Sequence, residues 1–129
     1  MSNIISMDWM DEEEKNQLEH MDKIRQAIAE AKGLLLPAEN QRALGYVTHY
    51  YEQATTRSAK AKAMMDEHFS NLLTNYPDLA IGRAKAMSQG SEFGKKYTFY
   101  KNQSEGYREI MQTLKKNIAY YEGAARNQW

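Results

Sequence analysis

Histidine is the side chain best suited to acid–base or metal chemistry near neutral pH, and this sequence has three: His20, His49 and His68. Metal sites in helical bundles place a glutamate three residues before a histidine, which sets both ligands on one helix face. No glutamate stands at that spacing before any of the three. His68 falls on an apolar stripe, so we expect it to be a packed residue rather than a ligand. The histidines therefore predict no metal site.

The other motifs of catalysis are missing as well. Cysteine is absent, which excludes a disulfide framework and a cysteine metal site. The glycines are isolated and form no phosphate-binding loop, and no serine stands in a nucleophile-elbow context. We therefore expect a protein that is not an enzyme and that has no catalytic residue, metal or cofactor.

Basic residues are the remaining side chains with a clear chemical use. In residues 95–121, KKYTFYKNQSEGYREIMQTLKKNIAYY, they interleave with aromatic residues. Three of them recur at every seventh position, in a stripe about 21 Å long at a helical rise of about 1.5 Å per residue. A second basic cluster lies in RSAKAKAMM, residues 57–65. The predicted nucleic-acid-binding residues are Lys101, Arg108 and Lys115 of the stripe and Arg57, Lys60 and Lys62 of the cluster.

These cations support two interpretations. In the first, they bind the phosphates of a nucleic acid while exposed aromatic rings stack on its bases. In the second, the stripe pairs with acidic residues of the first helix or of another subunit, and the rings widen the core. The rings that fall outside the apolar stripes are Tyr46, Tyr50, Phe99 and Tyr120. Their exposure decides much of the choice, and the sequence does not give it.

The charge of the chain is balanced overall but divided along its length. There are 17 basic and 17 acidic residues, which argues against a protein held to nucleic acid by bulk charge alone. Residues 1–40 carry nine acidic and four basic side chains, and residues 41–129 carry eight acidic and thirteen basic. The acidic segment is either an ordinary solvated helix face or a cover that competes for the basic surface.

Four helices are expected to position these residues, because the β-branched clusters that mark strands are missing. Asp8 or Asp11 could cap a helix over residues 11–35, and Asp11, Glu12, Glu13 and Glu14 suit the positive end of its dipole. Pro37 precedes a second helix over 38–75. A short helix over 78–89, with Asp78 as its cap and Gly90 as its stop, leads to a fourth over 91–126. Residues 1–10 are expected to be flexible.

Heptad spacing predicts that the two long helices pair. Apolar and small residues recur at alternating spacings of three and four along both. In 38–75 they are Leu44, Val47, Tyr51, Ala54, Ser58, Ala61, Met65, His68 and Leu72. In 91–126 they are Phe93, Tyr97, Tyr100, Ser104, Tyr107, Met111, Leu114, Ile118, Tyr121 and Ala125. The predicted fold is all-α, one domain over 1–129: a long antiparallel, coiled-coil-like hairpin with an added N-terminal helix and a short connecting helix.

The composition also bears on compartment and assembly. The first residues lack the basic and apolar regions of a signal peptide, and the longest apolar run is Leu34–Leu36, so we expect no membrane contact. The absence of cysteine fits a cytoplasmic protein. Mean hydropathy is −0.80, which suits thin apolar seams that complete their burial by oligomerising. We expect a homo-oligomer, and a clean monomer at about 100 μM would refute this.

The order of these features resembles that of the UvsY-like proteins, small helical recombination mediators of tailed phages. The matching parts are YYEQATTRSAKAKAMM (50–65), TNYPDLAIG (74–82) and YKNQSEGYREIMQTLKKNIAYYEG (100–123). The resemblance implies an oligomer in the cytoplasm of a bacterial host that binds single-stranded DNA and helps a recombinase replace single-strand-binding protein. It also implies that Arg57, Lys60 and Lys62 contact the DNA.

Three functions therefore remain open. The first is a phage-type accessory protein that binds single-stranded DNA and assists recombination or replication. The second is a helical inhibitor or adaptor that binds a protein, for example a phage protein that acts on a host defence or nucleic-acid enzyme. The third is a structural bundle subunit that only self-associates. Salt-sensitive retention of single-stranded DNA separates the first from the other two.

Overall fold

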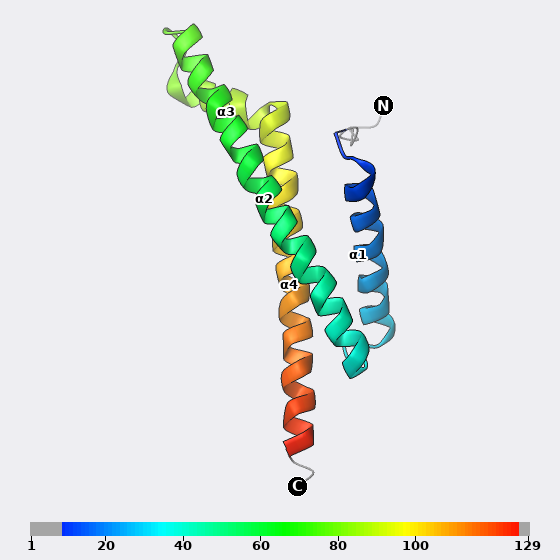
Figure 1. The fold of residues 1–129 in the computed structure, drawn as a ribbon. Coiled ribbons are helices and arrows are strands. Elements are labelled where there is room, and N and C mark those ends of the chain that lie inside the picture. The colour runs from blue at the N-terminus through cyan, green and yellow to red at the C-terminus, as the bar shows by residue number, and fades with distance from the viewer. Residues whose placement is uncertain (1–8, 127–129) are drawn as a thin grey trace. The chain divides into compact units, whose positions relative to one another are not determined.

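A computed structural model describes residues 9–126 of the chain. This part contains four helices and no strand: α1 (Glu12–Glu30), α2 (Pro37–Asn75), α3 (Ile81–Gly90) and α4 (Glu92–Arg126) (Figure 1). Helices α2 and α4 form the antiparallel hairpin, so the predicted all-α fold is confirmed. The flexibility expected for residues 1–10 concerns mainly residues 1–8, which lie outside the described residues. Within 9–126, no helix combines the length and apolarity needed to cross a bilayer.

The helix ends follow local chemistry. Asp11, one of the two predicted caps, caps α1, because the backbone N–H of Glu14 donates to its Oδ1 at 2.8 Å. The other, Asp8, lies outside the described residues. The predicted end at residue 35 is wrong by five residues. Lys32 and Gly33 adopt positive φ angles of 55° and 90°, and the Gly33 N–H donates to the Ile28 carbonyl at 2.8 Å. This is a glycine-terminated helix end.

The start of α3 also differs from the expectation. Ala80 is the N-cap and no side chain caps the helix, so the predicted cap at Asp78 is wrong. Gly90 is the last residue of α3, as its expected stop implied. Ser91 then turns the chain into α4, since its Oγ accepts a hydrogen bond from the Gly94 N–H at 3.3 Å. Short polar residues at such junctions replace the backbone partners that a helix end lacks.

The described residues divide into two compact units. Unit 1 comprises residues 9–47 and 112–126, which include α1, the first turns of α2 and the last turns of α4. Unit 2 comprises residues 48–111, which include the rest of α2, all of α3 and the first part of α4. The long helices α2 and α4 therefore contribute to both cores.

The core of unit 1 combines apolar side chains with a buried polar pair. The apolar members are Met10, Met21, Ile24, Leu35, Ala43, Val47 and Leu114. Asn40 of α2 is 0% exposed and Asn117 of α4 is 8% exposed. The Asn117 Nδ2 donates to the Asn40 Oδ1 and to the Gly33 carbonyl, both at 2.9 Å. Both buried asparagine side chains thus have hydrogen-bond partners, as the energetics of burial require.

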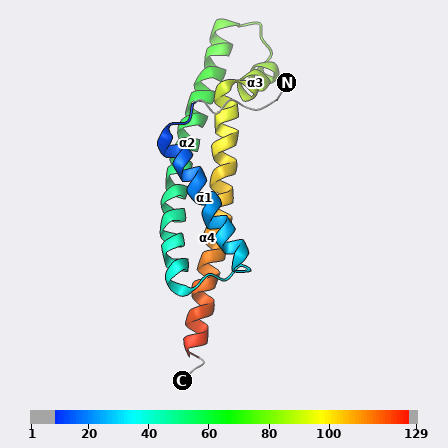
Figure 2. The same ribbon diagram turned by 90° about the vertical axis from the view of Figure 1, so that its right-hand side faces the viewer.

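The core of unit 2 joins large rings of α4 to small residues of α2. Tyr100 and Tyr107 are 6% and 1% exposed, and Ala54 and Ala61 of α2 are 0% and 6% exposed. Ser88 of α3 is also buried. Figure 2 shows α2 and α4 side by side, with α3 joining them at one end of the pair. The burial of large rings on α4 and of small residues on α2 fits two helices packed along their predicted seams.

Candidate nucleic-acid interface

The six predicted cations are mostly on the surface. Lys60, Lys62, Lys101, Arg108 and Lys115 are exposed, and Arg57 is half-buried. Lys115 belongs to unit 1 and the other five belong to unit 2. Arg57 takes part in further interactions within the structure. Only unit 2 therefore offers several of the predicted residues together.

Helix α2 separates the cations of its basic cluster. Successive residues of an α-helix are about 100° apart, so Lys60 and Lys62 point to opposite flanks of α2. Arg57 is three residues before Lys60 and shares its flank, about 60° away. The segment 57–65 is therefore not one basic patch, although its sequence reads as one.

One flank of unit 2 gathers cations from both long helices. Both helices are right-handed and they run antiparallel. On each helix, the residue that follows a seam residue lies about 100° further around the helix axis. In two antiparallel right-handed helices, the residues at this position lie on the same side of the pair. Lys62 of α2 lies on that side, and so do Lys101 and Arg108 of α4. Tyr51 of α2 and Tyr97 of α4 border it, and both are half-buried. We call the surface formed by these five residues the Lys62 flank.

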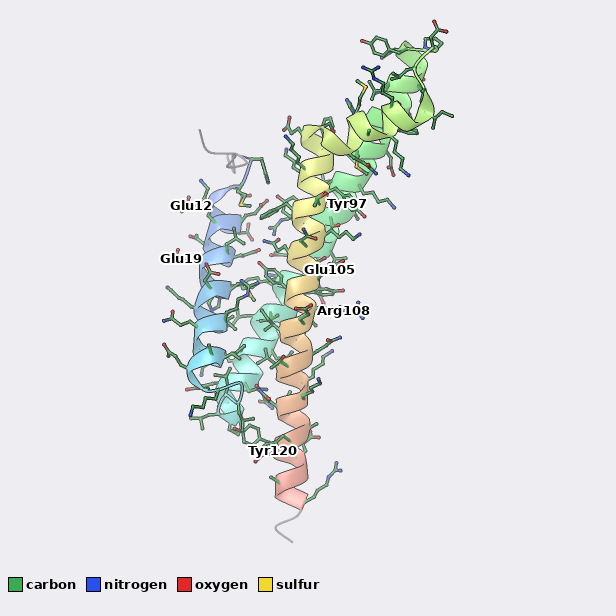
Figure 3. The ribbon with its side chains drawn as sticks, turned by 180° about the vertical axis from the view of Figure 1, so that it is seen from behind. Glu12, Glu19, Tyr97, Glu105, Arg108 and Tyr120 are labelled. Carbon is green, nitrogen blue, oxygen red and sulfur yellow. The ribbon has the colours of Figure 1, made fainter. Side chains whose placement is uncertain are left out.

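The cations of the Lys62 flank are not neutralised within the described structure. Lys62, Lys101 and Arg108 form no ion pair with any residue in 9–126. The Lys101 Nζ lies 6.0 Å from the centroid of the Tyr97 ring, at the outer limit of a cation–π contact. Glu105 lies on the same side of α4 as Tyr97 and Arg108 and lowers the local positive charge (Figure 3). The flank keeps a modest excess of positive charge.

The structure gives the exposure of the four rings that fall outside the predicted seams, and it corrects the placement of Tyr50. Tyr46 and Tyr120 are 46% and 60% exposed, and both belong to unit 1. Tyr50, expected to fall outside the seam, is buried at 9% and is part of the core. Phe99 is half-buried. The rings beside the unit 2 cations are instead Tyr51 and Tyr97, which the heptad pattern assigned to the seam.

The histidines occupy separate environments. The His68 Nδ1 lies 2.9 Å from the Ser88 Oγ, and Ser88 is 2% exposed. This contact joins α2 to α3 inside unit 2, and burial keeps the hydroxyl away from any substrate. His20 packs edge-to-face on Tyr46 with ring centroids 4.6 Å apart. His49 is exposed. No group of three histidine or acidic residues among the described ones is placed to hold a metal ion.

Comparison with protein-family models, with curated protein sequences and with solved structures gives no match for this chain. The fold and the chemistry of the described surfaces are therefore the ground for a functional proposal.

Proposed function

We propose that this chain is a non-enzymatic accessory protein that binds single-stranded DNA along the Lys62 flank. The observation that carries the proposal is the flank itself: three exposed cations without ion pairs, next to two half-buried tyrosine rings. Proteins that bind single strands without sequence preference combine a basic track with aromatic rings on which bases stack. The resemblance to UvsY-like mediators points to the same ligand.

The spacing of the flank suits an extended strand. Lys101 and Arg108 are seven residues apart on α4, which separates them by about 10 Å along the helix axis. The phosphates of a strand lying along the helices would contact these cations in turn. Its bases would turn toward Tyr51 and Tyr97. Stacking of this kind needs unpaired bases, so single strands bind in preference to duplex.

The role proposed for this binding is assistance to recombination or replication by a homo-oligomer in the cytoplasm, in the host bacterium if the chain is phage-encoded. Several copies side by side would lengthen a track that is short in one copy. Once one copy has bound the strand, binding of the same strand by the next copy of the oligomer is an intramolecular step. The total affinity therefore rises with each copy that contacts the strand.

Salt dependence is the first test of this function. A fluorescent single strand of about 30 nucleotides, followed by anisotropy, is expected to bind at about 50 mM salt. Three phosphate contacts per copy predict a loss of affinity of about 20-fold when the salt is raised to about 200 mM. A duplex of the same sequence is the control and is expected to bind more weakly. Absence of binding at the lower salt, or binding that salt does not weaken, would contradict the proposal.

A second candidate function is a helical adaptor or inhibitor that binds a protein. It is favoured by large apolar side chains exposed in unit 2. Tyr76 and Met87, at 60% and 45% exposure, line one cleft between the end of α2 and α3, and Ile81, at 68% exposure, lines another. Exposed apolar surface of this kind commonly marks protein contacts. A chain that folds stably and ignores single-stranded DNA at low salt would favour this candidate over the first.

The same apolar residues give a prediction about self-association. At about 100 μM, sedimentation is expected to show species larger than a monomer. A variant with Tyr76→Ser, Ile81→Ser and Met87→Ser is expected to shift toward the monomer, because it removes apolar surface that association would bury. A wild-type chain that sediments as a clean monomer would refute the expected oligomer. Association unchanged in the variant would place the contact elsewhere.

A further inference from the structure

A cleft in unit 1, between α1 and the first turns of α2, is independent of the Lys62 flank. Its volume is about 360 Å³. Ile24, Leu35 and Ala43 line it and are 7%, 5% and 8% exposed, so they form an apolar floor. Ala27 lines the same cleft and is exposed. The volume is near the lower limit for pockets that hold small organic molecules.

The cleft has a cation on each of its two helices. Lys23 of α1 and Arg42 of α2 both line it and are exposed. Neither forms an ion pair with any residue in 9–126. Glu39 also lines the cleft and is likewise without an ion pair in that range. Lys23, Arg42 and Glu39 together give the lining a formal net charge of +1, which attracts one negative charge and disfavours a second.

Aromatic rings border the cleft as well. His20 and Tyr46, both in the lining, meet edge-to-face at 4.6 Å with an interplanar angle of 78°. Tyr46 remains 46% exposed, so part of its ring is open to a ligand. Aromatic side chains prefer offset-stacked or edge-to-face contacts with other rings. The cleft thus combines an apolar floor, a ring, two cations and one carboxylate.

We propose that the α1–α2 cleft binds a small aromatic molecule with a single negative charge. The ring of the ligand rests on Ile24, Leu35 and Ala43 beside Tyr46, and its anionic group lies between Lys23 and Arg42. The apolar floor supplies affinity, and the two cations supply discrimination between charged and neutral ligands. This assignment does not depend on the proposed DNA binding.

Two dyes of closely similar shape test the proposal. The anionic probe is 8-anilinonaphthalene-1-sulfonate, and the neutral probe is N-phenyl-1-naphthylamine, which lacks the sulfonate. Fluorescence titration of the full chain is expected to show about tenfold tighter binding of the anionic dye, the equivalent of two partly exposed charge contacts. Lys23→Gln with Arg42→Gln is expected to remove this difference while leaving the neutral dye bound.

Two further variants locate the dye. Ala27→Phe places a ring inside the cleft at an exposed position, so folding is preserved while both dyes are expected to lose at least about tenfold in affinity. Lys15→Gln with Lys116→Gln removes two exposed charges of unit 1 outside the cleft and is the matched control. The proposal is overturned if the two dyes bind equally, if Ala27→Phe has no effect, or if the control pair weakens binding as much as the cleft pair.

Discussion

Replacing Gly94 with alanine is expected to destabilise unit 2 by about 3 kcal/mol, at the upper end of the cost of overpacking a core. Gly94 lies in the first turn of α4, and a Cβ built there would meet the backbone of the end of α3. It would lie 2.6 Å from the Ser88 carbonyl oxygen and still closer to that of Gln89. Backbone atoms cannot rotate away as a flexible side chain can, so the α3–α4 corner would have to open.

Urea denaturation followed by circular dichroism measures this effect, with Gly45→Ala as the matched control. Gly45 lies inside α2, and a Cβ there meets nothing within 4 Å. Alanine at that position is expected to stabilise the helix by about 0.5–1 kcal/mol, the usual difference between the two residues in a helix interior. If Gly94→Ala left the free energy of unfolding unchanged, the close approach of α3 to α4 would be wrong.

The second large effect is expected at the buried asparagine pair of unit 1. Asn40 donates to the Leu114 carbonyl at 2.9 Å and accepts from Asn117 at 2.9 Å. Asn40→Ala removes both bonds, so one N–H of the buried Asn117 amide and the Leu114 carbonyl each lose a partner, and a loss of about 2–3 kcal/mol is expected. Asn102→Ala, at an exposed position of α4, is the control and is expected to change stability by less than about 0.5 kcal/mol.

Replacing both members of the pair separates stability from specificity. Asn40→Leu with Asn117→Leu also removes the bond to the Gly33 carbonyl, but it leaves neither a cavity nor an unpaired side-chain amide. It is therefore expected to cost less than Asn40→Ala. A buried polar residue in a heptad seam sets the register of the helices, so the double variant is expected to populate more than one pairing, visible as extra amide resonances by NMR. Two results would contradict this account of the pair. One is a single set of amide resonances in the double variant, and the other is a loss of stability in Asn40→Ala no larger than that in Asn102→Ala.

Local chemistry explains why the helices could be predicted from the sequence. Asp11 at the start of α1 and Pro37 at the start of α2 act on the backbone of neighbouring residues. Both helix starts can therefore be predicted without knowledge of the tertiary structure. The predicted end of α1 lies too far along the chain because Leu35 continues the apolar spacing of the helix past the residue where the helix stops. The signal for the true end was Gly33, whose φ of 90° suits a left-handed helix terminus.

The seam shows where pattern alone is insufficient. Near the start of α2, Ala43, Val47 and Tyr50 are buried, whereas Leu44 and Tyr51 are half-buried. Both sets obey spacings of three and four, so hydrophobicity cannot choose between them. Tertiary packing decides which set is buried, and here it is the set that includes the small Ala43.

The candidate site was only partly predictable for a related reason. Residue types identify Lys101 and Arg108 as cations, but their lack of ion pairs depends on what lies around them in three dimensions. Asn40 and Asn117 were overlooked because an apolar pattern ignores polar residues. Asn117 nevertheless stands three residues after Leu114 and four before Tyr121, which is heptad spacing. A buried polar residue in a seam is the signal that would have found it.

Single-strand binding by the Lys62 flank is tested most directly by two variants with the same change in charge. One carries Lys62→Gln, Lys101→Gln and Arg108→Gln; the other carries Lys60→Gln, Arg83→Gln and Lys95→Gln, which are exposed positions of unit 2 outside the flank. Anisotropy at about 50 mM salt is expected to show at least a tenfold loss of affinity for the first and less than about threefold for the second. Equal losses would mean that bulk charge holds the strand, and no loss in the first variant would contradict the proposed site.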